Sequence, residues 1–428
     1  MRSFVVDTRP LRIPRFRDLW AGLSVSNLGA QLTVVAVGLQ VYDLTGSTPA
    51  VGLIGLAALV PLVVFGLYGG AIVDRHDRRT VAIGSALVGW ASTLGLLGQA
   101  LVGSHAVWPL YALVALNSAA NAVTSPARSA IVPRLVPAPL MAAANALQTL
   151  GWNVALTVGP LLGAVLVARA GYAAAYGLDA ALFTFALVAL VRLPPIPPEP
   201  GTAARGGFAL VVDGLRYLRG TPNLRMTFVV DVVAMMAMPR VLFPAVGVWF
   251  LGGGKTTTGA LTASIAVGGV LAGVLSGGLT RLRAQGKVIT WAITVWCAAM
   301  AAFGVVLVVV GPHRSGAADA VPVVPFALAA ALVALAVGGG ADAVSAMFRT
   351  TILQVATPDE YRGRLQGVFT VVVAGGPRIG DMALGGIAGR VGEQWAALGV
   401  GVLCLVVLWL VVGVQRTFWH YDASHPQP

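Results

Sequence analysis

The sequence predicts an all-α integral membrane protein with twelve transmembrane helices arranged as two six-helix halves. Of its 428 residues, 57% are hydrophobic and only 10% are charged, and the mean hydropathy is +0.84. A water-soluble core cannot bury so much apolar surface, so we expect lipid to surround the chain. The net charge of +12 is then explained by its distribution along the membrane topology, and we expect no nucleic-acid partner.

Apolar stretches long enough to cross a bilayer as helices, about twenty residues each, occur in two groups of six. The first group covers residues 19–42, 50–72, 80–101, 107–125, 140–168 and 172–192. The second group covers residues 226–251, 258–281, 288–311, 323–348, 363–387 and 395–414. These groups predict an N-terminal half of residues 1–193 and a C-terminal half of residues 226–428.

The segment between the halves, residues 194–225, is predicted to be a cytoplasmic linker. Its first part, from Pro194 to Gly207, is rich in Pro and Gly, a composition that forms stiff, extended connections. From Phe208 to Arg219, apolar residues recur at helical spacing. We therefore predict a short amphipathic helix on the cytoplasmic membrane surface.

The Lys and Arg residues test this topology, because cytoplasmic loops carry an excess of positive charge. Most of the 28 Lys and Arg residues fall in the N-terminal leader, the linker and the loops on the same side, where we also place Arg349. Two lie inside predicted spans, and the alternate loops hold Arg169, Lys255, Arg314 and Arg390. We therefore predict a multi-pass protein of the cell membrane with both termini in the cytoplasm.

The two halves repeat one another. The first half contains Arg128, Ile131 and Pro137, and the second half matches them with Arg349, Ile352 and Pro358, which indicates a duplication. Parallel-related halves with cytoplasmic termini and a long central loop resemble the major facilitator superfamily fold. The resemblance implies a substrate site near the middle of the membrane and alternating access to it.

The loop between the second and third spans reads Gly70-Ala-Ile-Val-Asp74-Arg75-His-Asp77-Arg78-Arg79. It resembles the superfamily's cytoplasmic signature, Gly-x-x-x-Asp-Arg-x-Gly-Arg-Arg, with Asp77 in place of the usual Gly. A small residue lets helices approach closely, and an acid can cap a helix or pair with arginine. Topology alone would also place arginines here. The resemblance implies a latch for the outward-facing state formed by Gly70, Asp74, Arg75, Arg78 and Arg79.

In the fifth span, Gly159-Pro160-Leu-Leu-Gly163 resembles the core of the superfamily's antiporter motif, Gly-Pro-x-x-Gly, although alanines such as Ala155 replace its earlier glycines. Proline kinks a helix, and small residues permit tight packing. The resemblance implies that Gly159, Pro160 and Gly163 form a hinge that limits ion leak, and a simple packing kink is the alternative.

Over most of its length the chain resembles exporters of the enterobactin-exporter type and related multidrug efflux proteins. The signature loop carries the likeness, together with the stretches Arg128 to Pro137, Arg240 to Ala245 and Thr357 to Arg364. This resemblance implies export of a small amphipathic molecule, such as a siderophore or a drug-like compound.

Ionisable side chains within spans cost several kcal/mol to insert, so each is a functional candidate. Arg240 and Arg378 lie near the middle of the seventh and eleventh spans and are predicted to contact the substrate. Asp381 follows Arg378 by one turn, so a local ion pair competes with a coupling role. Asp231 and Asp342 have no evident basic neighbour, and burial favours the neutral form of a carboxyl group. We predict proton coupling at Asp231, Asp342 or Asp381, with pairing to loop arginines as the alternative for Asp342.

Polar and aromatic residues in the N-terminal spans are weaker candidates for the central cavity: Gln31, Asn121, Gln148 and Trp152. Hydrogen bonding or packing between helices would equally explain them. Asp179, near the outer end of the sixth span, is expected to reach interfacial water and receives no role.

The sequence contains no metal-ligand cluster, nucleotide-binding loop or nucleophile elbow. We therefore predict neither an enzyme nor a bound cofactor, but a monomeric exporter coupled to protons. An importer or facilitator of a polar nutrient and a non-transporting sensor or assembly partner are the alternatives.

Overall fold

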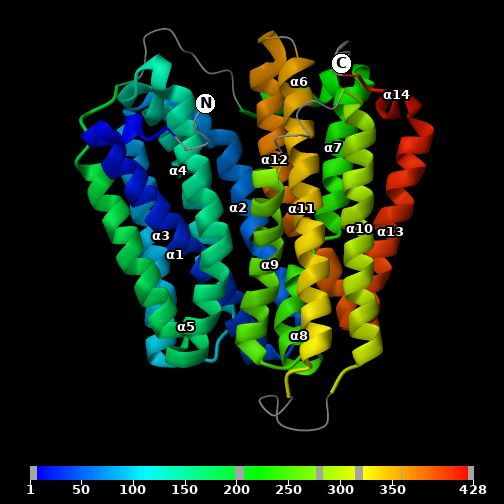
Figure 1. Ribbon diagram of the computed structural model, residues 1–428. Coiled ribbons are helices and arrows are strands. Elements are labelled where there is room, and N and C mark those ends of the chain that lie inside the picture. Colours follow the sequence, from blue (N-terminus) through cyan, green and yellow to red (C-terminus); the bar gives the residue numbers. More distant parts are fainter. Residues whose placement is uncertain (1–6, 198–206, 276–282, 314–321, 358, 423–428) are drawn as a thin grey trace. The chain divides into compact units, whose positions relative to one another are not determined.

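The computed structural model describes residues 7–197, 207–275, 283–313, 322–357 and 359–422. Within these ranges every regular element is a helix (Figure 1). Nine helical stretches in the described residues are long and apolar enough to cross a membrane. The protein is therefore a multi-pass membrane protein, as its composition predicts.

The chain divides into two compact units, which we describe separately. The N-terminal unit comprises Met1–Gln40 and Ala57–Gly207, and the C-terminal unit comprises Val41–Leu56 and Phe208–Pro428. The chain up to the linker forms η1 (Arg9–Arg12), α1 (Pro14–Thr45), α2 (Thr48–Arg75), α3 (Arg78–Val102), α4 (Trp108–Leu135), η2 (Ala138–Leu140) and α5 (Met141–Val191). The end of α1 and the start of α2 thus belong to the C-terminal unit.

Helix α5 is interrupted at Gly171, whose φ of 79° and ψ of 178° are not helical. Such a backbone conformation favours glycine, which has no Cβ to clash. The interruption falls between the predicted fifth and sixth apolar stretches, so α5 consists of two arms joined at this residue.

Helix α1 packs against both arms of α5. Gly22 contacts the backbone of Ala186 in the second arm, and Gly163 contacts the backbone of Leu32 from the first arm. The core beside these contacts is apolar and includes Phe16, Leu19, Ile131 and Leu190, each at most 1% exposed. Small residues are needed where α1 and α5 meet, because in lipid helices associate through close packing.

The second half of the chain forms α6 (Gly207–Gly220), α7 (Pro222–Met236), η3 (Arg240–Leu242), α8 (Phe243–Trp249), α9 (Gly254–Leu275), α10 (Gln285–Val310), α11 (Pro325–Val355), α12 (Asp359–Val391), α13 (Glu393–Val414) and α14 (Arg416–Trp419). Helix α6 occupies the position at which the sequence predicts a short amphipathic helix. In this unit α11 packs between α9 and α10, and α10 also packs against α13.

The expectation of a single helix over residues 226–251 is wrong. Helix α7 ends at Met236, and the chain passes through Ala237–Pro239 and the short turn η3 before α8 begins. Proline has no N–H to donate and clashes with the preceding turn, so Pro239 disfavours a continuous helix here. Arg240 therefore lies in a 3-10 turn between two helices.

Glycines set the tight packing between helices of the C-terminal unit. A methyl group at Gly268 in α9 would clash with the carbonyl oxygen of Ala336 in α11, and one at Gly304 in α10 would clash with the backbone of Leu398 in α13. Backbones can approach this closely only where one side chain is absent.

Candidate functional site

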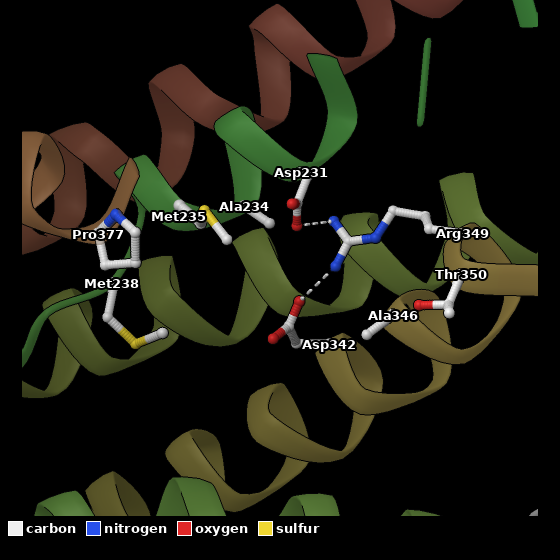
Figure 2. Close-up of a pocket in the computed structure, with 9 residues that line it drawn as sticks. All are labelled: Asp231, Ala234, Met235, Met238, Asp342, Ala346, Arg349, Thr350 and Pro377. Carbon is white, nitrogen blue, oxygen red and sulfur yellow. Dashed lines mark hydrogen bonds and ion pairs between the residues drawn. The ribbon is translucent and has the colours of Figure 1, made fainter. Parts of the chain in front are cut away.

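Two carboxylates from different helices share one guanidinium group. Nη1 of Arg349 lies 2.5 Å from Oδ1 of Asp231, and its Nη2 lies 3.5 Å from Oδ1 of Asp342. Figure 2 shows both carboxylates pointing toward the Arg349 side chain. Asp342 thus has an arginine partner, as the pairing alternative for this residue predicted, whereas the basic partner of Asp231 was not foreseen.

The helices explain this arrangement. Asp342 and Arg349 lie seven residues apart on α11, which places them on the same face of that helix. Asp231 comes from α7, which packs against α11. The side chains of Asp231 and Arg349 are each 7% exposed, whereas that of Asp342 is 34% exposed. Asp342 is therefore the more exposed of the two acids.

Arg349 was expected in a cytoplasmic loop, but the structure places it inside α11 with its side chain buried. Arg349 directly follows the apolar stretch 323–348 and was therefore assigned to a loop. The helix continues to Val355, and hydropathy alone does not show where a helix ends. No pattern in the sequence shows that Arg349 meets these two acids; its match in the repeat, Arg128, lies in the corresponding helix α4.

A cavity of about 180 Å³ adjoins the three charged residues. Apolar side chains of Ala234, Met235, Met238 and Ala346 form part of its wall, and Thr350 and Pro377 complete it. The lining comes from α7, α11, α12 and the break after α7. The wall therefore combines apolar side chains with the charged groups of Asp231, Asp342 and Arg349.

A second charged cluster in the C-terminal unit contains Arg240, Arg378 and Asp381. The charges of both arginines act on Asp381, and Arg240 also acts on Asp342. The Oδ1 atom of Asp381 has no hydrogen-bond partner among the described residues. Arg240, Arg378 and Asp381 therefore influence one another electrostatically, and the ion pair of Arg378 with Asp381 stays a prediction.

Together the two clusters contain three acids and three arginines. The trio of Asp231, Asp342 and Arg349 has a formal charge of −1, and the trio of Arg240, Arg378 and Asp381 has a formal charge of +1. The charges balance over α7, η3, α11 and α12, which lowers the cost of burying them in a membrane.

The helix α2 lies directly against the second cluster. A methyl group at Gly55 would lie 2.6 Å from the carbonyl oxygen of Arg378, and one at Gly52 would lie 2.9 Å from that of Asp381. The glycines thus allow the start of α2 to pack on α12 at its charged residues.

The weaker cavity candidates lie in the N-terminal unit. Asn121 is exposed and donates a hydrogen bond to Asn117 at 2.8 Å, and Gln148 lies 3.4 Å from Asn145. Trp152 is 44% exposed. Gln31 is half-buried on α1. A role of these four residues in substrate binding stays a prediction.

The antiporter-like motif lies at the contact between α5 and α1. A methyl group at Gly159 would lie 2.5 Å from Cβ of Gln31, and one at Gly163 would lie 2.9 Å from Cα of Leu32. Pro160 lies within α5. Gly159 and Gly163 therefore face α1. A hinge at this motif would act on the packing between α5 and α1.

The signature loop is described only in part. Gly70 and Asp74 lie in α2 among residues whose side chains fall outside the described part of the structure, and Arg75 is exposed. Arg78 donates to the carbonyl oxygen of Ala130 at 3.4 Å, and Arg79 donates to that of Val191 at 2.6 Å. These two bonds lie within the N-terminal unit, and the latch itself stays a prediction.

Asp77, the departure from the signature, caps α3. Its Oδ1 accepts a hydrogen bond from the Thr80 N–H at 2.8 Å, and its Oδ2 accepts one from the Ile196 N–H at 2.6 Å. Partial burial raises the pKa of this carboxyl, but the hydrogen bonds from Thr80 and Ile196 outweigh it and hold the pKa below its usual value.

Asp179 also departs from expectation. It does not reach interfacial water: it is 2% exposed and accepts hydrogen bonds from Thr33 and Thr93. These threonines could not be identified as partners from the sequence, because they lie on other helices.

Residues 6–427 match the transmembrane secretion effector family. The chain belongs to this family of the major facilitator superfamily. The chain is 27% identical to the enterobactin exporter EntS of Salmonella typhimurium, over 95% of this chain and 94% of the relative. It is 28% identical to EntS of Escherichia coli K12, over 97% of this chain and 95% of the relative. These relatives are named as transporters rather than enzymes.

Solved structures of transporters share the fold of this chain. A POT family transporter in complex with 5-aminolevulinic acid superposes with a TM-score of 0.71 at 12% identity, over 97% of this chain and 98% of that chain. The nucleoside transporter NupG superposes with a TM-score of 0.69 at 14% identity, over 94% of this chain and 99% of that chain. At these identities the likeness concerns the fold alone.

Proposed function

We propose that the protein exports a small amphipathic molecule from the cytoplasm by proton antiport, with alternating access to its substrate site. Membership of the secretion effector family and the likeness to enterobactin exporters support transport in the outward direction. The observation that carries the coupling is Arg349, shared between Asp231 and Asp342 beside a cavity.

One guanidinium group cannot neutralise two carboxylates, so one of the two carboxylates can bind a proton. Asp342 is the acid that would take it, because its side chain is 34% exposed while that of Asp231 is 7% exposed. Protonation would leave Arg349 paired with Asp231 alone. Asp231 then serves to hold the guanidinium group in place.

Competition between the proton and the substrate would produce the antiport. A hydroxyl or amine group of a ligand in the cavity donates a stronger hydrogen bond to the ionised carboxylate of Asp342 than to its protonated form. Proton binding would therefore weaken ligand binding and favour release. Arg240 and Arg378 offer a complementary site for an acidic group of the ligand, and Asp381 restrains them.

The helices also fit the proposed membrane topology. The N-terminal half would cross six times, through α1, α2, α3, α4 and the two arms of α5. The C-terminal half would also cross six times, through α7 together with α8, and through α9, α10, α11, α12 and α13. We propose that the protein lies in the cell membrane as a monomer with both termini in the cytoplasm, in line with its distribution of Lys and Arg. Accessibility of single cysteines introduced at the loops tests this topology.

Transport is tested with purified protein in proteoliposomes, using enterobactin and ethidium as probes. We expect an imposed pH gradient to drive accumulation of at least one probe, and nigericin to abolish it. In Asp342→Asn, the gradient should no longer drive accumulation, whereas exchange of labelled for unlabelled probe without a gradient should continue. Gradient-driven transport at the wild-type rate in Asp342→Asn would contradict the assignment, and transport unaffected by nigericin would contradict proton coupling.

A further inference from the structure

The carboxyl group of Asp179 is buried where α1, α3 and α5 meet. The residue is 2% exposed. Its Oδ2 atom accepts hydrogen bonds from Oγ1 of Thr33 in α1 at 2.6 Å and from Oγ1 of Thr93 in α3 at 3.4 Å. Its Oδ1 atom has no hydrogen-bond partner among the residues that the structure describes.

No described basic side chain neutralises Asp179. From α1 it meets Gly29 and Thr33, and from α3 it meets Thr93. The titratable group that faces it is Tyr176 on its own helix, whose hydroxyl donates a hydrogen bond to Oε1 of Gln40 at 2.7 Å. The surroundings are therefore polar but uncharged, unlike those of Asp231, Asp342 and Asp381.

An ionised carboxylate without a cation partner is costly at membrane depth, and protonation removes that cost. The neighbouring groups can serve both forms. Thr33 and Thr93 donate to the carboxylate, and Oγ1 of Thr93 also lies 3.4 Å from the carbonyl oxygen of Gly89, which gives this hydroxyl another acceptor. The free Oδ1 atom is the position at which a proton would add.

We propose that Asp179 is a proton-binding site of the N-terminal unit, in addition to the acids of the C-terminal unit. Direct coordination of a sodium ion is the competing use of such oxygen atoms. The 2.6 Å hydrogen bond between Thr33 and Oδ2 favours the proton, because an ion would have to separate these two oxygens.

The position of Asp179 gives its proton a structural effect. A methyl group at Gly29 would clash with Oδ1 of Asp179, so the carboxyl group lies directly against the backbone of α1. Two residues further along α1, Gln31 contacts Gly159 of the antiporter-like motif. A proton at Asp179 therefore changes the hydrogen bonding of the same helix that the motif packs against. Any effect on transport rests on the proposed export function, whereas proton binding itself does not.

Infrared difference spectroscopy of the full-length protein in lipid, between acidic and alkaline buffer, tests the proposal directly. We expect a carbonyl band of a buried carboxylic acid that shifts in heavy water and is lost in Asp179→Asn. The control Asp213→Asn removes an exposed carboxylate of α6 and should retain the band. An unchanged difference spectrum in Asp179→Asn would overturn the proposal.

A second variant keeps the test independent of the folding of Asp179→Asn. In Thr33→Val the aspartate remains but loses its 2.6 Å hydrogen bond, so the band should move to higher frequency as that bond is removed. A purely structural role of Thr33 would leave the frequency unchanged, and that result would overturn the assignment of the band to Asp179. Replacing potassium by sodium at constant pH should leave the band intact, and its loss would identify a sodium site instead.

The same preparations separate this proposal from the proposed function. If enterobactin and ethidium are not transported but the band is lost in Asp179→Asn, the proton site stands and the export function fails. If transport driven by the pH gradient is found but no band depends on Asp179, the export function stands and the proton site fails.

Discussion

Asp77 accepts a hydrogen bond through its Oδ2 atom from the backbone N–H of Ile196 at 2.6 Å, 119 positions further along the chain. The backbone N–H of Arg78 donates in return to the carbonyl oxygen of Ile196 at 3.0 Å. Asp77 thus ties the start of α3 to the segment that follows α5. A glycine at this position, usual in the superfamily signature, could supply neither the cap nor this tie.

Asp77→Ala should lower the stability of the purified protein by about 1 kcal/mol, as expected for the loss of a helix N-cap. The pKa of Asp77 lies below its usual value, so its ionised form stabilises the fold. This contribution is complete above the unfolded pKa, about 3.9, and is lost as the pH falls through the lower folded pKa. Thermal midpoints measured by tryptophan fluorescence against pH should show the deficit at neutral pH and its disappearance in acid. The control is Asp18→Ala, which removes an exposed acid, and an equal deficit there would contradict the role of Asp77.

Arg349→Gln should be among the most damaging single substitutions in the C-terminal unit. It leaves Asp231 and Asp342 without their shared cation, and breaking a buried pair by removing one partner costs about 3–5 kcal/mol. Adding Asp231→Asn should recover much of the folded yield, because it removes one of the two uncompensated charges. Size-exclusion profiles of the single and double variants measure this. Arg219→Gln in α6 is the control, and failure of the double variant to improve on Arg349→Gln would argue against the shared pairing.

Gly163→Ala should destabilise the N-terminal unit, whereas Gly84→Ala should not. A methyl group at Gly163 would lie 2.9 Å from Cα of Leu32, while the site at Gly84 is open. Overpacking of this kind costs about 1–3 kcal/mol, and alanine in place of glycine in an open helix gains up to about 1 kcal/mol. Thermal midpoints of the two variants should therefore move in opposite directions. Equal midpoints would show that α1 does not pack on this motif.

Cys297 and Cys404 should not react with a water-soluble maleimide until the protein unfolds. Both are free and buried, with exposures of 0% and 6%. The rate of labelling during heating then reports unfolding of the C-terminal unit. Phe326→Cys, at a position that is 91% exposed near the start of α11, provides the accessible control. Labelling of the wild type in the native state at the rate of this control would contradict the burial.

The sequence predicted the membrane environment and the helical fold because both depend on the amount and spacing of apolar residues. The break in α5 at Gly171 also falls where hydropathy divides two stretches. The break after Met236 was missed, since an apolar run looks continuous whether or not Pro239 interrupts its helix.

The sequence identified the acids of the candidate site but not the arginine that they share. Asp231 and Asp342 were found because charges in apolar stretches stand out, but their partner Arg349 was assigned to a loop. Asp179 was given no role, since its exposure depends on how α1 and α3 cover it. Hydropathy identifies the helix to which a residue belongs, but the direction in which its side chain points is set by packing between helices.

The interruption of α7 has a consequence for biogenesis. With 15 residues, α7 is about 22 Å long, shorter than the roughly 30 Å of hydrocarbon that it would have to cross. Helix α7 is therefore too short to span the bilayer by itself and must be inserted together with α8. The backbone groups between the two helices would be exposed to lipid at that moment, which is costly. In the folded protein, α12 packs against α7 and η3, and α9 packs against α8, on either side of this bend.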